Sequence, residues 1–151
     1  MSEFTKKTLR IMLVENDEDD VFFVQRALTH AGFTYPLFRL RNGREAVDYF
    51  KAADASSPTF PHIVLMDMKM PGMDGLEVLR WLREESQFKD LSVVILTSSD
   101  IPADMSKSCR LGIYKFLTKR THYDNVISTL ESFLTAANAL PSNAKMGMSS
   151  D

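Results

Sequence analysis

Several residue types are scarce in this sequence of 151 residues, and each shortage excludes a class of protein. The one cysteine, Cys109, rules out a disulfide within the chain and indicates a reducing, intracellular environment. Glycine and proline number six each, too few for a collagen-like or low-complexity chain. No apolar run approaches the roughly 20 residues that a membrane-spanning helix needs. The first ten residues, MSEFTKKTLR, also lack the apolar stretch of a signal peptide, so we expect a cytoplasmic protein.

A surplus of positive charge is missing as well. The chain has 18 Lys and Arg residues against 20 Asp and Glu residues, a net charge of −2. A protein that binds nucleic acid usually carries a basic surplus to neutralise phosphates. We therefore expect neither nucleic acid nor a membrane to be a direct partner.

Short apolar runs alternate five times with segments of helical periodicity. We expect strands at residues 9–14, 38–40, 63–66, 91–96 and 115–118, and helices at 21–31, 45–53, 76–82, 102–111 and 124–137. Five β/α units in succession predict an α/β fold in which one doubly wound parallel sheet has helices on both faces. Residues 1–7 are expected to form an N-terminal extension, 8–137 the domain, and the polar segment 138–151 a disordered tail.

Polar side chains follow four of the expected strands. Glu15 and Asn16 follow the first strand, Asp67 the third, Thr97 the fourth and Lys119 the fifth. Ligands of open α/β sheets bind at the carboxyl ends of strands, near the point where the strand order reverses. Oxygen ligands suit Mg²⁺, and an ammonium beside a hydroxyl suits a phosphoryl group. The sequence therefore predicts a site for Mg²⁺ and a phosphoryl group at this edge.

The acidic run after the first strand has a structural interpretation. Asp17 is positioned to cap the first helix, and the carboxylates of Glu18, Asp19 and Asp20 fall in its first turn, where the helix dipole favours them. We interpret these three as a solvated helix start. A second capping pair, Thr121 and Asp124, precedes the last helix.

Four segments in order carry a resemblance to a known family: LRIMLVENDEDD, VLMDMKMPGMDG, VVILTSS and YKFLTK. Over residues 8–136 the chain resembles the receiver domains of two-component response regulators. It is most similar to the stand-alone receivers that partner phytochrome-like and other sensor histidine kinases. The resemblance implies a flavodoxin-like (βα)5 fold and a phosphorelay switch, not an enzyme that turns over outside substrates. The switch would accept a phosphoryl group from a histidine kinase or phosphotransfer protein and signal through a protein partner.

The resemblance also implies a phosphorylation site with Mg²⁺ as its cofactor. Asp67 matches the aspartate that accepts the phosphoryl group. Glu15 and Asn16 match the pair of residues that holds Mg²⁺, together with Asp67 and the backbone carbonyl of Lys69.

Further roles follow from the same match. Thr97 and Lys119 would contact the phosphoryl group, and the backbone amides of Met68 and Ser98 would cradle its oxygens. Phe116 lies at the aromatic switch position. The surface expected to change is that of the fourth helix, fifth strand and fifth helix, through which a homodimer is possible.

Two residues depart from the family pattern. Asn16 replaces an acidic residue, so the pocket has two carboxylates instead of three, which predicts weaker Mg²⁺ binding with phosphorylation retained. Arg120 replaces a proline that often follows a cis peptide. A cis bond before a non-proline residue costs roughly 3 kcal/mol, so this bond is trans or stores that strain.

The sequence also bears on three alternative functions. Phosphatases of the haloacid-dehalogenase type need a second aspartate two residues after the acceptor, and this chain has Lys69 there. Neither GxGxxG nor GxxxxGK[ST] occurs, which argues against nucleotide binding. A receiver-like interaction module that works without phosphorylation stays open because of Asn16 and Arg120.

Overall fold

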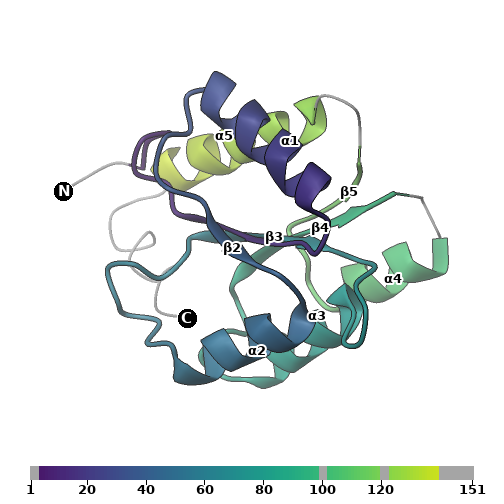
Figure 1. Cartoon of the computed structure of the whole chain (residues 1–151). Coiled ribbons are helices and arrows are strands. Elements are labelled where there is room, and N and C mark those ends of the chain that lie inside the picture. The colour runs from purple at the N-terminus through teal and green to yellow at the C-terminus, as the bar shows by residue number, and fades with distance from the viewer. Residues whose placement is uncertain (1–3, 99–101, 120–122, 140–151) are drawn as a thin grey trace.

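The computed structural model describes residues 4–98, 102–119 and 123–139 of the chain. Five parallel strands form one sheet in the order β2-β1-β3-β4-β5 (Figure 1). The strands are β1 (Ile11–Val14), β2 (Phe38–Leu40), β3 (Ile63–Asp67), β4 (Ser92–Thr97) and β5 (Lys115–Thr118). The strand order reverses between β1 and β3, and ligands of open α/β sheets bind at the carboxyl ends of strands beside such a reversal.

Helices cover both faces of the sheet, with α1 and α5 on one face and α2, α3 and α4 on the other (Figure 1). They are α1 (Glu18–His30), α2 (Gly43–Ala52), α3 (Gly75–Glu84), α4 (Pro102–Arg110) and α5 (Asp124–Ala139). Alternation along β1 divides the core. Met12 and Val14 pack in the cluster under α2 and α3, whereas Ile11 and Leu13 pack in the cluster under α1 and α5. Central strands buried on both faces explain the uninterrupted apolar runs in the sequence.

The doubly wound α/β fold predicted from the sequence is confirmed. Strands 38–40 and 115–118 have the expected bounds, and the other strands begin or end within two residues of them. The helices begin and end within three residues of their expected bounds. The expected tail begins too early, because Asn138 lies in α5, where its side-chain amide pairs with the backbone of Phe4 at 2.9 and 2.7 Å. Residues 140–151 of the expected tail lie outside the described residues, as do Thr121 of the capping pair and Arg120.

Two helix starts fix the loops beside the carboxyl ends of β1 and β3. Asp17 caps α1 as expected by accepting a hydrogen bond from the backbone amide of Asp20. Asp74 and Glu77 form a capping box at the start of α3. Gly75 then returns close to β3, because its amide donates to the Met68 carbonyl at 3.0 Å. A Cβ at this position would lie 2.5 Å from the carbonyl oxygen of Asp67, so a larger residue would displace the end of β3.

Within the described ranges, no helix has the length and apolar character needed to cross a membrane.

The opposite end of the sheet contains a histidine whose charge state affects stability. The Nδ1 atom of His62 accepts a hydrogen bond from the Arg10 amide at 2.9 Å, and its ring packs edge-on against Phe4. Burial, with a smaller contribution from the nearby Arg10 charge, lowers the pKa of His62 to about 4. The folded protein therefore keeps this ring neutral at pH values where the unfolded chain protonates it.

His62 should make the fold less stable as the pH falls from about 6.5 to 4, because the unfolded state binds more protons over that window. His62→Gln keeps a hydrogen-bond acceptor without this titration. We expect the difference in unfolding free energy between wild type and variant to grow from pH 4 to 6.5 and to level off above that. Urea titrations at several pH values measure it, and a difference independent of pH would contradict the assignment.

Candidate functional site

The carboxyl ends of four neighbouring strands bring the candidate residues to one pocket. The register aligns Val14 with Met66 and Thr97 with Thr118, so the residues that end or follow these strands are neighbours. Three of the polar side chains are almost completely covered: the exposed fractions are 1% for Glu15, 5% for Asp67 and 1% for Thr97. Buried polar groups need partners, so the pocket requires a compensating charge.

Lys119 supplies that charge. Its Nζ lies 2.7 Å from Glu15 Oε1, 2.8 Å from Asp20 Oδ2 and 3.4 Å from Asp67 Oδ1, with 14% of its side chain exposed. The backbone amide of Lys119 also donates to the Thr97 carbonyl at 2.6 Å, which fixes the end of β5 against β4. One ammonium is thus shared among three carboxylates.

The pocket changes the proton affinity of both partners in its shortest ion pair. Burial raises the pKa of Glu15 to about 7, assisted by the charge of Asp67 and opposed by the hydrogen bond from Lys119. Burial alone would lower the pKa of Lys119, but the hydrogen bonds to Asp20 and Glu15 outweigh it and keep this pKa above its ordinary value. The lysine therefore stays charged, and Glu15 titrates near neutral pH.

Two members of this network were missed in the sequence. Asp20 is half-buried, not a solvated residue of the helix start, because it binds Lys119 and accepts a hydrogen bond from the Tyr123 hydroxyl at 3.3 Å. Its spacing gives a signal: Asp20, Val24 and Leu28 recur every four residues, and the last two are the buried residues of α1. Glu18, in the same acidic run, does not join this network: it is exposed and pairs with Arg39 and Arg41.

The donors expected to hold Mg²⁺ fit a hard cation. Glu15 and Asp67 contribute carboxylate oxygens at adjacent strand ends, which is the number of carboxylates that Mg²⁺ commonly uses. The loop after β3 is held close, since the Lys69 amide lies 3.4 Å from Asp67 Oδ1. Asn16 is exposed next to Glu15. Among the residues that the structure describes, no three His, Cys, Asp or Glu side chains are grouped to hold a metal.

The remaining expected roles stay predictions. The Met68 amide donates to the Leu96 carbonyl at 2.7 Å, so cradling a phosphoryl oxygen would require it to leave or share that bond. Ser98 is exposed just beyond β4, and Phe116 is half-buried in β5, packed against the core cluster that contains Met12 and Val14.

Comparisons with known proteins identify the kind of site. Residues 11–131 match the response regulator receiver domain family. The response regulator Rcp1 of Synechocystis sp. is 28% identical over 145 residues, covering 93% of this chain and 99% of Rcp1. The polar-differentiation response regulator DivK of Brucella anthropi is 27% identical over 124 residues, covering 82% of this chain and 94% of DivK.

Solved structures agree with the sequence relatives. The phosphorylated cyanobacterial phytochrome response regulator RcpA superposes with a TM-score of 0.73 at 27% identity, covering 89% of this chain and 99% of RcpA. The Mn²⁺-bound form of Rcp1 gives a TM-score of 0.70 at 25% identity, covering 89% of this chain and 98% of that structure.

The family match, on a parallel sheet with an acidic pocket and a shared lysine at the carboxyl ends of its strands, identifies a signalling receiver of the two-component type. The chain belongs to the response regulator receiver domain family, as its sequence motifs indicated.

Proposed function

We propose that this chain is a phosphorylation switch that receives a phosphoryl group on Asp67 from a phosphohistidine. The donor would be a sensor histidine kinase or a phosphotransfer protein, and the signal would pass on through a protein partner. The proposal rests chiefly on one observation, the Lys119 ammonium held between Glu15 and Asp67 in a buried pocket. The phosphorylated state of RcpA and the Mn²⁺ bound to Rcp1 support it by analogy.

Phosphoryl transfer to Asp67 requires little covalent participation by other residues of the protein. The phosphorus–nitrogen bond of phosphohistidine breaks as a bond forms from phosphorus to an Asp67 carboxylate oxygen, and the departing imidazole takes up a proton. Charge spreads over the phosphoryl oxygens in a loose transition state, so positioning and neutralisation dominate. Asp67 is positioned by the backbone of β3, of which it is the last residue, and the positively charged Lys119 Nζ lies 3.4 Å from its carboxylate.

Mg²⁺ would be held by Glu15, Asp67, the Asn16 amide oxygen and the Lys69 carbonyl, and when bound it supplies positive charge for the transferring phosphoryl group. The phosphorylated aspartate then carries about −1.5 to −2 charges. Thr97 and Lys119 gain a new partner, and Phe116 moves with Thr97. The face formed by α4, β5 and α5 would respond and could bind a partner or a second copy.

Intact mass measurement after incubation with Mg²⁺ and a small-molecule phosphodonor tests the proposal. We expect wild type to gain one phosphoryl group and Asp67→Asn to gain none, because the amide cannot accept it. The variant's circular dichroism shows whether the fold is kept. A folded wild type that gains no mass at saturating Mg²⁺ would favour the alternative, an interaction module that works without phosphorylation.

A further inference from the structure

One carboxylate links the phosphorylation pocket to the starts of two helices. Asp20, in the first turn of α1, accepts hydrogen bonds from Lys119 Nζ at 2.8 Å and from the Tyr123 hydroxyl at 3.3 Å. Tyr123 immediately precedes α5. Asp20 therefore connects the lysine beside Asp67 to the place where α5 begins.

Tyr123 is a constrained residue. Its side chain is 4% exposed, and its backbone has φ 55°, a left-handed conformation that bulky residues rarely adopt. Burial, with the charge of Asp20 adding to it, raises the pKa of Tyr123 to about 12, so the hydroxyl keeps its proton and acts as a donor. The Tyr123 carbonyl accepts hydrogen bonds from the amides of Val126 and Ile127, so a shift of Tyr123 moves the first turn of α5.

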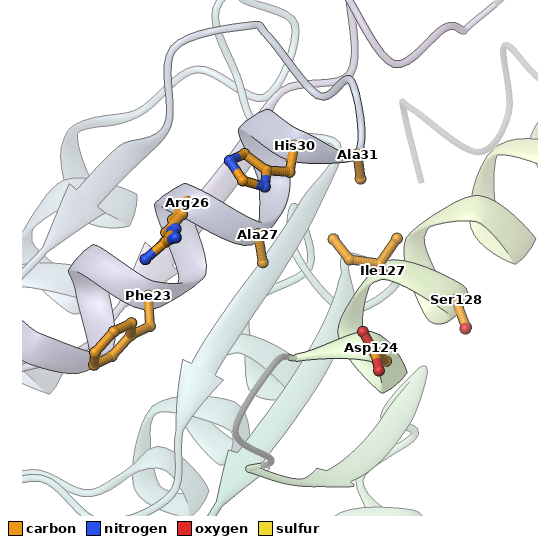
Figure 2. A pocket seen from close by; sticks show the side chains of 8 residues that line it. All are labelled: Phe23, Arg26, Ala27, His30, Ala31, Asp124, Ile127 and Ser128. Atoms are coloured by element: carbon orange, nitrogen blue, oxygen red, sulfur yellow. The ribbon is translucent and has the colours of Figure 1, made fainter.

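The two helices joined through Asp20 also form the walls of a groove. Figure 2 shows side chains of α1 along one wall and side chains from the first turns of α5 along the other. The principal lining residues are Phe23, Arg26, His30, Asp124, Ile127 and Ser128. The position of the first turn of α5 relative to α1 therefore affects the shape of this groove.

We propose that Asp20 and Tyr123 form a latch that opposes phosphorylation and couples the state of Asp67 to the groove between α1 and α5. The inference rests on the proposed function. Lys119 has three N–H donors, and before phosphorylation its shortest bonds go to Glu15 and Asp20 rather than to Asp67. A phosphoryl group on Asp67 adds charge that draws the lysine away from Asp20.

The release of Asp20 by Lys119 then affects α5 in two steps. When Lys119 leaves Asp20, the Asp20 carboxylate is no longer held in its place beside the Tyr123 hydroxyl, and the hydrogen bond between these two residues weakens. Tyr123 is freed from its constrained position, and the first turn of α5 shifts along the groove. Asp20 acts through Lys119 and Tyr123 and does not contact the phosphoryl group, so it is a positioning residue.

Beryllofluoride, added together with Mg²⁺, mimics the phosphoryl group on aspartate. Its affinity, measured by calorimetric titration, reports how strongly the Asp20–Tyr123 contact opposes that state. We expect Tyr123→Phe to bind about threefold to tenfold more tightly than wild type, because its hydrogen bond to Asp20, which is long at 3.3 Å, is already lost. Asp20→Asn should bind about tenfold more tightly, because it removes the carboxylate that competes for Lys119. Adding Tyr123→Phe to Asp20→Asn should change nothing further. Tyr114→Phe and Asp19→Asn are matched controls that should keep wild-type affinity.

Hydrogen exchange gives a second readout that does not depend on affinity. In wild type, beryllofluoride should speed exchange of the Val126 and Ile127 amides, whose acceptor is the Tyr123 carbonyl. In Tyr123→Phe these amides should exchange faster even without beryllofluoride.

The outcomes separate the two proposals. If wild type neither binds beryllofluoride nor becomes phosphorylated, the proposed function fails. If wild type binds it but Tyr123→Phe leaves both affinity and exchange unchanged, the latch is overturned while the switch stands. Weaker binding by Asp20→Asn would also overturn the latch, since Asp20 would then hold Lys119 in place for the phosphoryl group. Should Asp20→Asn fail to fold, Tyr123→Phe decides alone.

Discussion

Lys119→Met is expected to lower the free energy of unfolding by about 3 kcal/mol, within the range for breaking a buried ion pair. The substitution keeps a long apolar stem but leaves Glu15 and Asp67 without the cation that they share. Both carboxylates are almost fully buried, so water cannot replace that cation. The third partner, Asp20, is 30% exposed and can turn to solvent, which limits the loss.

Magnesium should restore part of the stability of Lys119→Met. A divalent cation between Glu15 and Asp67 would neutralise the charges that the lysine no longer covers. The melting temperature of the variant should therefore rise more on Mg²⁺ addition than that of wild type, although phosphorylation would be lost or much slower in the mass assay. Lys115→Met, an exposed lysine at the other end of β5, is the matched control. Equal stability of Lys119→Met and this control would show that the pocket does not need the lysine.

The sequence predicted much of this pocket because a parallel sheet imposes the geometry. Once the strands were recognised, the residues at their carboxyl ends had to meet at one edge, which placed Glu15, Asp67, Thr97 and Lys119 together. No knowledge of side-chain contacts was needed. The same reasoning did not reach the strand order: right-handed crossovers favoured a doubly wound sheet, and the structure shows that the order reverses between β1 and β3.

Asp20 and Tyr123 could not be found in that way. An acidic residue in the first turn of a helix has a sufficient local explanation in the helix dipole, which hid its contact with Lys119. Only the spacing of Asp20 with Val24 and Leu28 marks it as a residue of the buried side. Tyr123 meets Asp20 across 103 positions of sequence, and no short-range pattern reports a contact of that kind.

The bond after Lys119 illustrates a different limit. The sequence poses a clear alternative between a trans bond and a strained cis bond, because Arg120 stands where the family has proline. Arg120 lies outside the described residues, so this prediction remains one from sequence. It does not bear on the placement of Lys119, whose amide and ammonium are both held by described partners.

Asn16→Asp is expected to raise the affinity for Mg²⁺ by at least tenfold. Asn16 lies beside Glu15, and an aspartate there would give the site a third carboxylate facing the cation. Two unit charges about 4 Å apart interact by roughly 4 kcal/mol near a protein surface, so even partial realisation of that attraction exceeds the 1.4 kcal/mol of a tenfold change. Calorimetric titration with MgCl2 in wild type and variant measures the difference. Asp19→Asn removes a negative charge from the exposed part of the same acidic run and Asp19→Glu keeps it, so comparing the two shows how strongly general charge affects the affinity.

The pH dependence of that titration separates a metal effect from a change in the fold. Because the pKa of Glu15 is about 7, a proton competes with Mg²⁺ below neutrality, and wild-type affinity should rise between about pH 6 and 8. Asn16→Asp adds a negative charge that raises the Glu15 pKa further when no metal is bound. The Mg²⁺ affinity of Asn16→Asp should therefore rise more steeply than that of wild type over the same pH range. Without Mg²⁺, the melting temperature of the variant at pH 8 should be lower than that of wild type. Equal Mg²⁺ affinity for the two proteins at pH 8 would mean that residue 16 does not face the cation, and weak Mg²⁺ binding would then need another cause.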